Sequence, residues 1–351
     1  MAARVGWDWR CAPPITSFPD HANMFAPKIF PRVMPYAGRD PIFARGQRTV
    51  AMVLIMAAAI GASPAQAATP VALPATDLGE TNILDGEAGP GAMFEVISYG
   101  AAANTLKDAS GNSVNGRNHQ QISSLILHPV YIENTPIAGA YPGVEVLIPF
   151  AHVQNNFAVP GTGSDTGAGD ITIAPFLQWT PQNPGKGSIS VRAAIQFTMP
   201  TGDYRANEAV NAGYGGWQVS PYVAATWRVT DKWEVSSRFI DGWSSPVNGL
   251  DAEGVPARLR AGNFMVLNAS ASYAVTPQAR LGIGGYMLRQ ISDSTVDGAA
   301  VPGSLQRVNA LGPVTRWSGG RWNLLFAAYK EFGAQNRPEG FSTNVRFEWF
   351  F

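Results

Sequence analysis

The chain has 351 residues, and its 25 basic and 25 acidic side chains balance while charged residues make up only 14% of the sequence. Its one cysteine, Cys11, excludes an internal disulfide and a cysteine metal site. The mean hydropathy is near zero, and beyond residue 67 no apolar run reaches the ~20 residues of a membrane helix. These features exclude a bundle of transmembrane helices.

The amino end reads as a secretory signal peptide. The apolar run Val50–Ala62 follows Arg45 and Arg48, and small residues lead to a cleavage site after Ala67. A membrane helix is the weaker alternative, because the run is too short and a cleavage site follows at once. The Pro- and Arg-rich stretch further upstream suggests an over-extended start, and a start at Met34 would leave a conventional signal. Residues 1–67 are therefore set aside from the fold.

Removing residues 1–67 takes away seven basic and three acidic residues, which leaves a net charge of about −4. This balance argues against nucleic acid as a partner. The Pro-, Gly- and Ala-rich residues 68–90 are predicted to form a periplasmic N-terminal lead, either a tail or a partial plug. Residues 91–351 are predicted to form one domain.

Apolar and polar residues alternate along several segments of that domain. In 188–199 the odd-numbered positions are all apolar, whereas the even-numbered ones include serine, arginine and glutamine. The span 217–229 repeats the pattern and is bracketed by Trp217 and Trp227, and similar alternation recurs in 170–180, 263–275 and 321–332. One or two such strands would fit a soluble sandwich. Repetition with flanking aromatics predicts an all-β fold, a transmembrane antiparallel β-barrel of the bacterial outer membrane.

Short turns alternate with longer polar segments, as periplasmic turns and extracellular loops do in such barrels. We expect about twelve strands, an even number that closes the barrel with both termini in the periplasm. Their approximate spans are 92–101, 119–133, 141–153, 170–180, 188–200, 214–229, 232–243, 263–275, 279–291, 309–318, 321–332 and 341–351.

The carboxyl end fixes which face of the last strand meets lipid. Val345, Phe347, Trp349 and Phe351 are apolar, whereas their neighbours Asn344, Arg346 and Glu348 are polar or charged. The terminal aromatic resembles the signature that the barrel-assembly machinery reads, so this machinery and outer-membrane lipids are expected partners.

Charged residues on the inward face are the candidate lumen lining, because charges on a lipid-facing wall cost a few kcal/mol at mid-depth. They are Glu145, Asp170, Arg192, Arg228, Glu234, Arg238, Arg280, Arg346 and Glu348. Two interpretations stay open: opposite charges that knit the lumen together, or a constriction that selects polar or anionic groups.

Prolines fall on five consecutive predicted strands, at Pro129, Pro149, Pro175, Pro200 and Pro221. Each removes a ladder donor. One hypothesis is that Pro149, Pro175 and Pro221 kink one wall and open a lateral way into the membrane. The alternative is independent local bulges. Continuous hydrogen bonding around these three prolines would exclude the lateral opening.

An enzyme is the rival class. His119, His128 and His152 follow the signal peptide, but none lies in a His-x-Ser arrangement, and a nucleophilic mechanism needs serine and histidine within hydrogen-bond reach. No calcium-loop or phosphate-loop spacing occurs. We therefore expect no catalytic residues, no cofactor and no metal.

Several motifs resemble a known family. They are Gly169–Thr172 with Pro175, Met199–Tyr204, Ala310–Pro313 and Lys330–Gly340. Together they resemble the outer-membrane family associated with the meta-pathway of phenol degradation, over nearly the whole chain after residue 67. Arg316-Trp317-Ser318 departs from the pattern by being more polar than a lipid-facing wall. The resemblance implies a channel or transporter for passive uptake of small hydrophobic or aromatic molecules. The alternatives are an outer-membrane enzyme of lipase or acyltransferase type and a structural barrel without transport.

Overall fold

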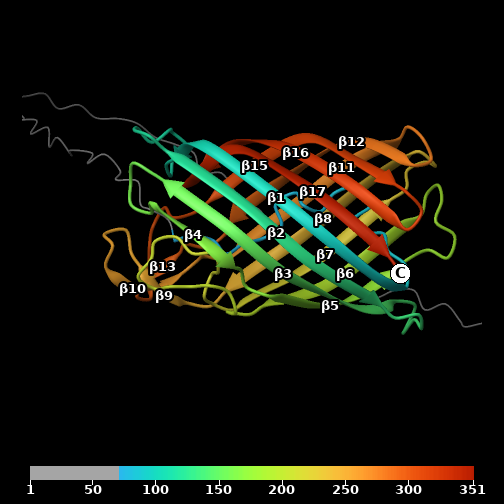
Figure 1. Ribbon diagram of the computed structural model, residues 1–351, viewed down its shortest axis with the longest axis horizontal. Helices are drawn as coiled ribbons and strands as arrows, with labels where there is room; N and C mark the ends of the chain where they lie inside the picture. Colours follow the sequence, from blue (N-terminus) through green and yellow to red (C-terminus); the bar gives the residue numbers. More distant parts are fainter. Residues whose placement is uncertain (1–70) are drawn as a thin grey trace, which may run out of the picture. The chain divides into compact units, whose positions relative to one another are not determined.

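The computed structural model describes residues 71–351, and the predicted signal peptide and its cleavage site lie outside these residues (Figure 1). Twelve antiparallel strands form a closed barrel, which confirms the predicted fold class and strand number. In order around the wall they are β1 (Gly91–Lys107), β2 (His119–Ile132), β3 (Tyr141–Asn156), β5 (Thr172–Trp179), β6 (Ile189–Thr198), β7 (Gln218–Trp227), β8 (Trp233–Ser244), β11 (Phe264–Ala274), β12 (Ala279–Gln290), β15 (Arg307–Ser318), β16 (Trp322–Gln335) and β17 (Arg337–Phe350). Within residues 71–351, no helix is long and apolar enough to cross a bilayer.

The first and last strands close the barrel. β1 pairs with β17 from Met93 opposite Phe350 to Lys107 opposite Arg337. The long β1 takes in residues that the sequence suggested as a loop. β17 likewise begins right after Asn336, whose φ of 51° turns the chain between β16 and β17.

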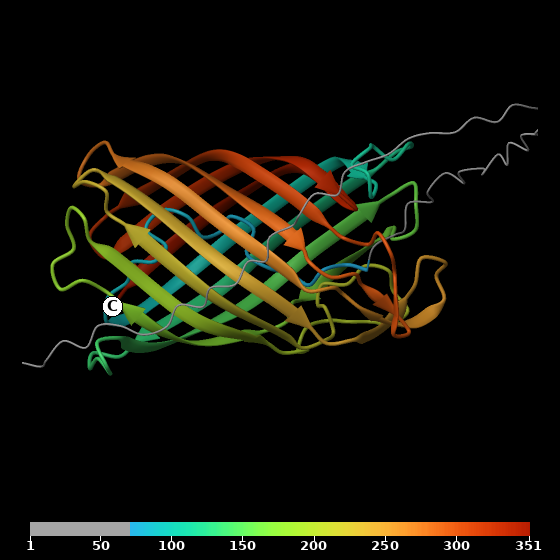
Figure 2. The same ribbon diagram turned by 180° about the vertical axis from the view of Figure 1, so that it is seen from behind.

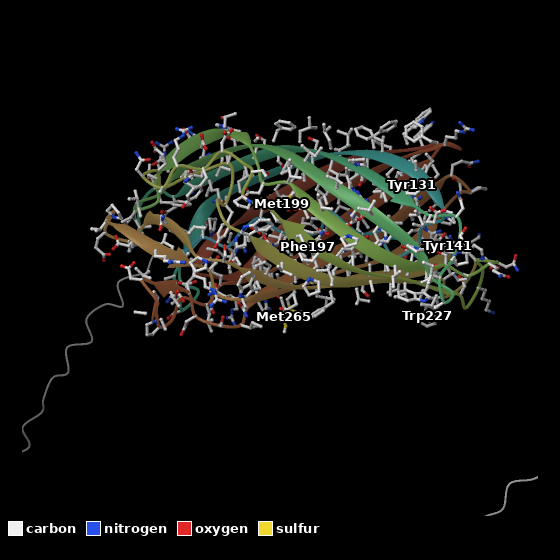
Figure 3. The ribbon with its side chains drawn as sticks, turned by 90° about the horizontal axis from the view of Figure 1, so that it is seen from below. Tyr131, Tyr141, Phe197, Met199, Trp227 and Met265 are labelled. Carbon is white, nitrogen blue, oxygen red and sulfur yellow. The ribbon has the colours of Figure 1, made fainter. Side chains whose placement is uncertain are left out.

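Alternation along each strand separates an apolar outer wall from a polar interior. Trp227 is 48% exposed, whereas its neighbour Thr226 is fully buried. Tyr131, Phe197 and Trp227 are exposed on the outer wall (Figure 3). Period two on a closed sheet places every second side chain inside, so the inward set can be read strand by strand.

The two ends of the barrel differ in their connections. Short turns lie at the end that holds the carboxyl terminus (Figure 1). The opposite end carries a small four-stranded sheet made of β9 (Val247–Leu250), β10 (Pro256–Arg260), β13 (Thr295–Val296) and β14 (Ala299–Ala300). In outer-membrane barrels the short turns face the periplasm, which orients the molecule.

One wall strand is broken. The short strand β4 (Gly163–Ala168) pairs with the upper part of β3, and β5 pairs with its lower part. The partner of β3 changes next to Pro149, whose carbonyl accepts a hydrogen bond from Gly169 at 2.8 Å. The two ladders differ in register by one residue, which is the geometry of a bulge.

Other prolines interrupt single ladders. The β5–β6 ladder breaks at Pro175 and resumes at Phe176 opposite Ala194, and the β7–β8 ladder breaks at Pro221 and resumes at Tyr222 opposite Ile240. The β2–β3 ladder skips Pro129 in the same way. Each ladder resumes in unchanged register, so the interruptions are local, and the hydrogen bonding is not continuous around these residues.

Candidate functional site: the barrel lumen

A stretch of chain before the first strand lies inside the barrel (Figure 2, blue). Gly79 donates its backbone N–H to Asn268 Oδ1 of β11 at 3.1 Å. Its carbonyl accepts from Tyr329 Oη of β16 at 2.9 Å and from Asn344 Nδ2 of β17 at 3.1 Å. With a φ of +81°, Gly79 adopts a conformation that side chains disfavour, and a Cβ there would lie 2.7 Å from the Tyr329 ring. The glycine thus permits this close approach.

A second group of contacts ties the same segment to the opposite wall. Asp85 accepts two hydrogen bonds from Arg238 of β8, at 2.9 and 2.7 Å. Glu87 accepts from Arg228 Nε at 2.8 Å, and Gly86 donates to Thr226 Oγ1 at 2.9 Å. Anchored on both sides, residues 71–90, hereafter the N-terminal segment, cross the lumen. These contacts hold the segment within the lumen.

A chain of buried polar side chains runs along the inner wall from β16 through β17, β1, β2 and β3 to β6 and β5. Its members in order are Asn323, Glu348, Arg346, Glu95, His128, Glu145, Arg192 and Gln178. We call this set the charge belt. Arg346 forms ion pairs with both Glu95 and Glu348. Charges this deeply buried persist only when they are paired and hydrogen-bonded, and the belt supplies those partners.

His128 occupies the centre of the charge belt. Its Nδ1 lies 2.6 Å from Glu95 Oε2, and its Nε2 lies 3.4 Å from Glu145 Oε2. The longer contact does not meet hydrogen-bond geometry, so it is electrostatic. Glu145 also accepts from Tyr222 Oη at 2.9 Å and pairs with Arg192 at 3.4 Å. Four strands thereby converge on one carboxylate.

The remaining predicted lumen residues occupy different places. Glu234 is fully buried and accepts from Ser236 and Ser272, and Arg280 Nε donates to Ser272 Oγ at 2.9 Å. Asp170 lies in the break between β4 and β5. Its carboxylate accepts from the backbone of Gly202, Tyr214 and Gly215, so it holds the loop between β6 and β7.

The lumen also contains residues that the sequence did not assign to its lining. Glu95 and His128 join the charge belt, and Asp85 and Glu87 anchor the N-terminal segment. Alternation in β1 could have revealed Glu95, because exposed Phe94 precedes it. Asp85 and Glu87 lie in a segment without periodicity, and no local pattern marks them.

The three histidines within residues 71–351 have distinct partners. His119 Nδ1 lies 2.8 Å from Asn104 Oδ1, and His152 Nδ1 lies 2.6 Å from Thr166 Oγ1. His128 lies between two glutamates. Among residues 71–351, no group of three His, Cys, Asp or Glu side chains is arranged to hold a metal ion.

The fold is shared with solved outer-membrane barrels. An outer membrane channel from Pseudomonas putida F1 matches at 20% identity with a TM-score of 0.68, covering 79% of this chain and 100% of that one. The transport unit of the autotransporter AIDA-I from Escherichia coli matches at 9% identity with a TM-score of 0.48, covering 74% and 90%. The TodX monoaromatic hydrocarbon channel matches at 8% identity with a TM-score of 0.39, covering 74% and 89%. The last two are too distant to add to the argument.

No curated protein matches the chain significantly. A family model, in contrast, matches residues 103–347. This span includes the PTGDY stretch at 200–204 and the motif at 330–340. Because the matched region covers more than half of the chain, the protein belongs to the family described as "Putative MetA-pathway of phenol degradation".

Proposed function

We propose that the protein is an outer-membrane channel for the passive uptake of small hydrophobic or aromatic compounds. One observation supports the proposal most directly. The N-terminal segment crosses the lumen and is held there by polar contacts. A lumen packed only by the side chains of its own strands would offer no path for a solute. A lumen blocked by a segment that can move aside would open such a path. The family described above supports the choice of aromatic solutes.

Two assays test the channel. Purified protein in planar bilayers and in liposomes is compared with a variant that lacks residues 71–90. We expect low conductance and measurable toluene or phenol uptake for the intact chain, and a large rise in conductance for the deletion variant. Absence of both uptake and conductance in both proteins would exclude a channel.

A lateral route through the wall is the second part of the proposal. It is supported by the ladder interruptions at Pro175 and Pro221 and by the break opposite Pro149. A groove of about 480 Å³ lies on the outer wall beside that break, lined by Leu125, Phe150 and neighbouring residues of β2, β3 and β4. The register is unchanged beyond the interruptions at Pro175 and Pro221, which supports the alternative of local bulges.

A reversible disulfide cross-link distinguishes a lateral route from local bulges. Ile173 and Phe197 are directly opposed next to the Pro175 interruption, at a spacing that a disulfide can bridge. In a Cys11→Ser background, Ile173→Cys with Phe197→Cys should reduce uptake when oxidised and restore it when reduced. The matched pair Ala271→Cys with Ile283→Cys staples an uninterrupted ladder and should leave uptake unchanged. Equal uptake in both stapled proteins would leave only local bulges.

A structural barrel without transport is the second candidate function, because the N-terminal segment occludes the lumen. The deletion experiment above also tests it. We further propose that the protein is not an enzyme, since within residues 71–351 none of His119, His128 and His152 contacts both a hydroxyl and a carboxylate, as the base of a catalytic triad does. A lipid-hydrolysis assay with pure protein should show no activity.

A further inference from the structure

A polar cavity of about 280 Å³ opens among the short turns at the end that holds the carboxyl terminus. Three arginines line it: Arg228, Arg280 and Arg316. The N-terminal segment contributes Leu84 and Glu87, and the turns contribute small and polar residues. The volume is close to the roughly 300 Å³ at which small-molecule sites begin. We call this cavity the arginine pocket.

Two of the arginines face each other without a carboxylate between them. Arg280 on β12 and Arg316 on β15 are direct cross-strand partners, and both belong to the inward face. Like charges directly opposite each other destabilise a sheet. The polar Arg316 that departs from the expected lipid-facing wall therefore points inward, while Trp317 beside it is 57% exposed. An arrangement that is unfavourable by itself becomes favourable when an anion lies between the two groups.

The acidic groups nearby are already engaged. Among residues 71–351, Glu87 is the only carboxylate that lines the pocket, and it forms an ion pair with Arg228. Glu234, close by on β8, accepts from Ser236 and Ser272. Glu348 on β17, which also attracts Arg316, is engaged by Asn323 and Arg346. The described residues around the pocket therefore leave it with an excess of positive charge.

Arg316 has donors to spare. Its Nε is buried and has no hydrogen-bond partner. Among residues 71–351 its guanidinium forms neither an ion pair nor a hydrogen bond. A guanidinium presents five N–H donors in a fork that matches a carboxylate. A buried donor without a partner is costly, and a carboxylate placed here would satisfy this Nε.

We propose that the arginine pocket binds a small organic carboxylate. The carboxylate lies between the guanidinium groups of Arg280 and Arg316, and the apolar remainder contacts Leu84, Ala274 and Pro277. The proposal goes beyond the channel function, because binding at this end of the lumen requires no passage through it. The turn end of the barrel would then bind anionic solutes, whereas the solutes proposed above for the channel are neutral.

Calorimetric titration tests the site. Full-length protein in nonionic detergent at low ionic strength is titrated with benzoate. Wild type should show saturable binding, and Arg316→Gln should weaken it at least about tenfold, because charge-assisted hydrogen bonds are lost. Arg289→Gln is the matched control: it removes one positive charge from β12, outside the pocket, and should bind as wild type does. Equal binding by Arg316→Gln and wild type would overturn the proposal.

Two further ligands define the chemistry. Benzyl alcohol, which keeps the ring but lacks the charge, should bind at least about tenfold more weakly than benzoate. Inorganic phosphate should also bind more weakly, because it makes no use of the apolar lining. Phosphate that binds as tightly as benzoate would contradict the organic part of the proposal, and benzyl alcohol that does so would contradict the anionic part.

A stability measurement guards against misfolding. Without ligand, Arg316→Gln should melt no lower than wild type, because one member of a like-charge pair is gone. Benzoate should raise the melting temperature of wild type and of Arg289→Gln but not of Arg316→Gln. Because these measurements need no membrane, failed transport in liposomes would leave the binding result standing, and failed binding would leave the channel standing.

Discussion

Buried charges inside the lumen depend on particular partners at the scale of single residues. Glu95 is fully buried and contacts both Arg346 and His128. It therefore joins the strand that begins the barrel to the strand that ends it. Removing one member of a buried pair leaves the other uncompensated, which costs more than the pair itself contributes.

Substituting Glu95→Gln should lower the free energy of unfolding by about 3 kcal/mol, because Arg346 and His128 lose a shared carboxylate. Urea unfolding in detergent, followed by tryptophan fluorescence, measures the change. Glu339→Gln is the control: Glu339 lies 3.8 Å from Lys107 and is partly exposed, so its loss should cost less than about 1 kcal/mol. Equal costs for the two variants would contradict the importance of the charge belt.

Gly79 offers a test of the N-terminal segment with a single methyl group. Gly79→Ala places a Cβ against the Tyr329 and Tyr286 rings at a backbone angle that alanine disfavours. We expect higher conductance in planar bilayers with an unchanged barrel. Gly89→Ala is the matched control, because a Cβ at Gly89 meets no atom within 4 Å. Conductance that rises equally in both would show that the segment is not held at Gly79.

At the scale of elements, the broken strand is stabilised by the loop that follows β6. The Asp170 carboxylate accepts from three backbone N–H groups of that loop, and Asp203 accepts from Ala168 N at 2.9 Å. β4 pairs with β3 on one edge. On its other edge, the loop takes the place of a strand partner.

Replacing Asp170 by alanine should release this loop. Arg205 is exposed within the loop, so trypsin should cleave there several times faster in Asp170→Ala than in wild type. Cleavage is followed by mass spectrometry of the fragments. Asp251→Ala, which disrupts only its own turn between β9 and β10, should leave the rate at Arg205 unchanged. A rate at Arg205 that stays at the wild-type value in Asp170→Ala would show that the Asp170 hydrogen bonds are not needed to hold the loop.

Strands in which apolar and polar residues alternate could be predicted from sequence, and segments without this alternation could not. Strands such as β6 and β7 follow directly from alternation around Arg192 and Thr226. The stretch 333–340 instead reads as a loop, because its Gly, Asn and Pro residues are typical of turns. In the structure Gly333 and Asn336 take positive φ angles while the ladders continue on either side. The N-terminal segment has no repeat at all, and its position depends on distant partners such as Arg238.

For the molecule as a whole, the charge belt and the closure of β1 on β17 unite distant parts of the chain. The inward charges on the last strand could be assigned from Phe351 backwards. The pairing of Arg346 with Glu95 on β1 could not, because pairing across the closure depends on the register of strands far apart in sequence. The arginine pocket likewise arises only when β12 and β15 lie side by side.

Phe351 itself should matter for assembly more than for stability. This residue is 75% exposed, and its backbone N–H donates to Ala92 O at 3.1 Å. Deleting Phe351 should reduce the amount of barrel in the outer membrane of cells several-fold and leave refolding in detergent nearly unchanged. Membrane fractionation and gel mobility measure the two quantities. A parallel loss in detergent would point to a purely structural role.

Continuity between the N-terminal segment and β1 at Gly91 makes the segment a tethered ligand of its own barrel. A short tether holds its binding groups at an effective concentration on the order of millimolar or above. Any solute that displaces it competes against that local concentration, and no dilution of the protein lowers it. In the proposed channel, this tether would restore occlusion of the lumen each time a solute leaves, without a partner protein and without an energy source.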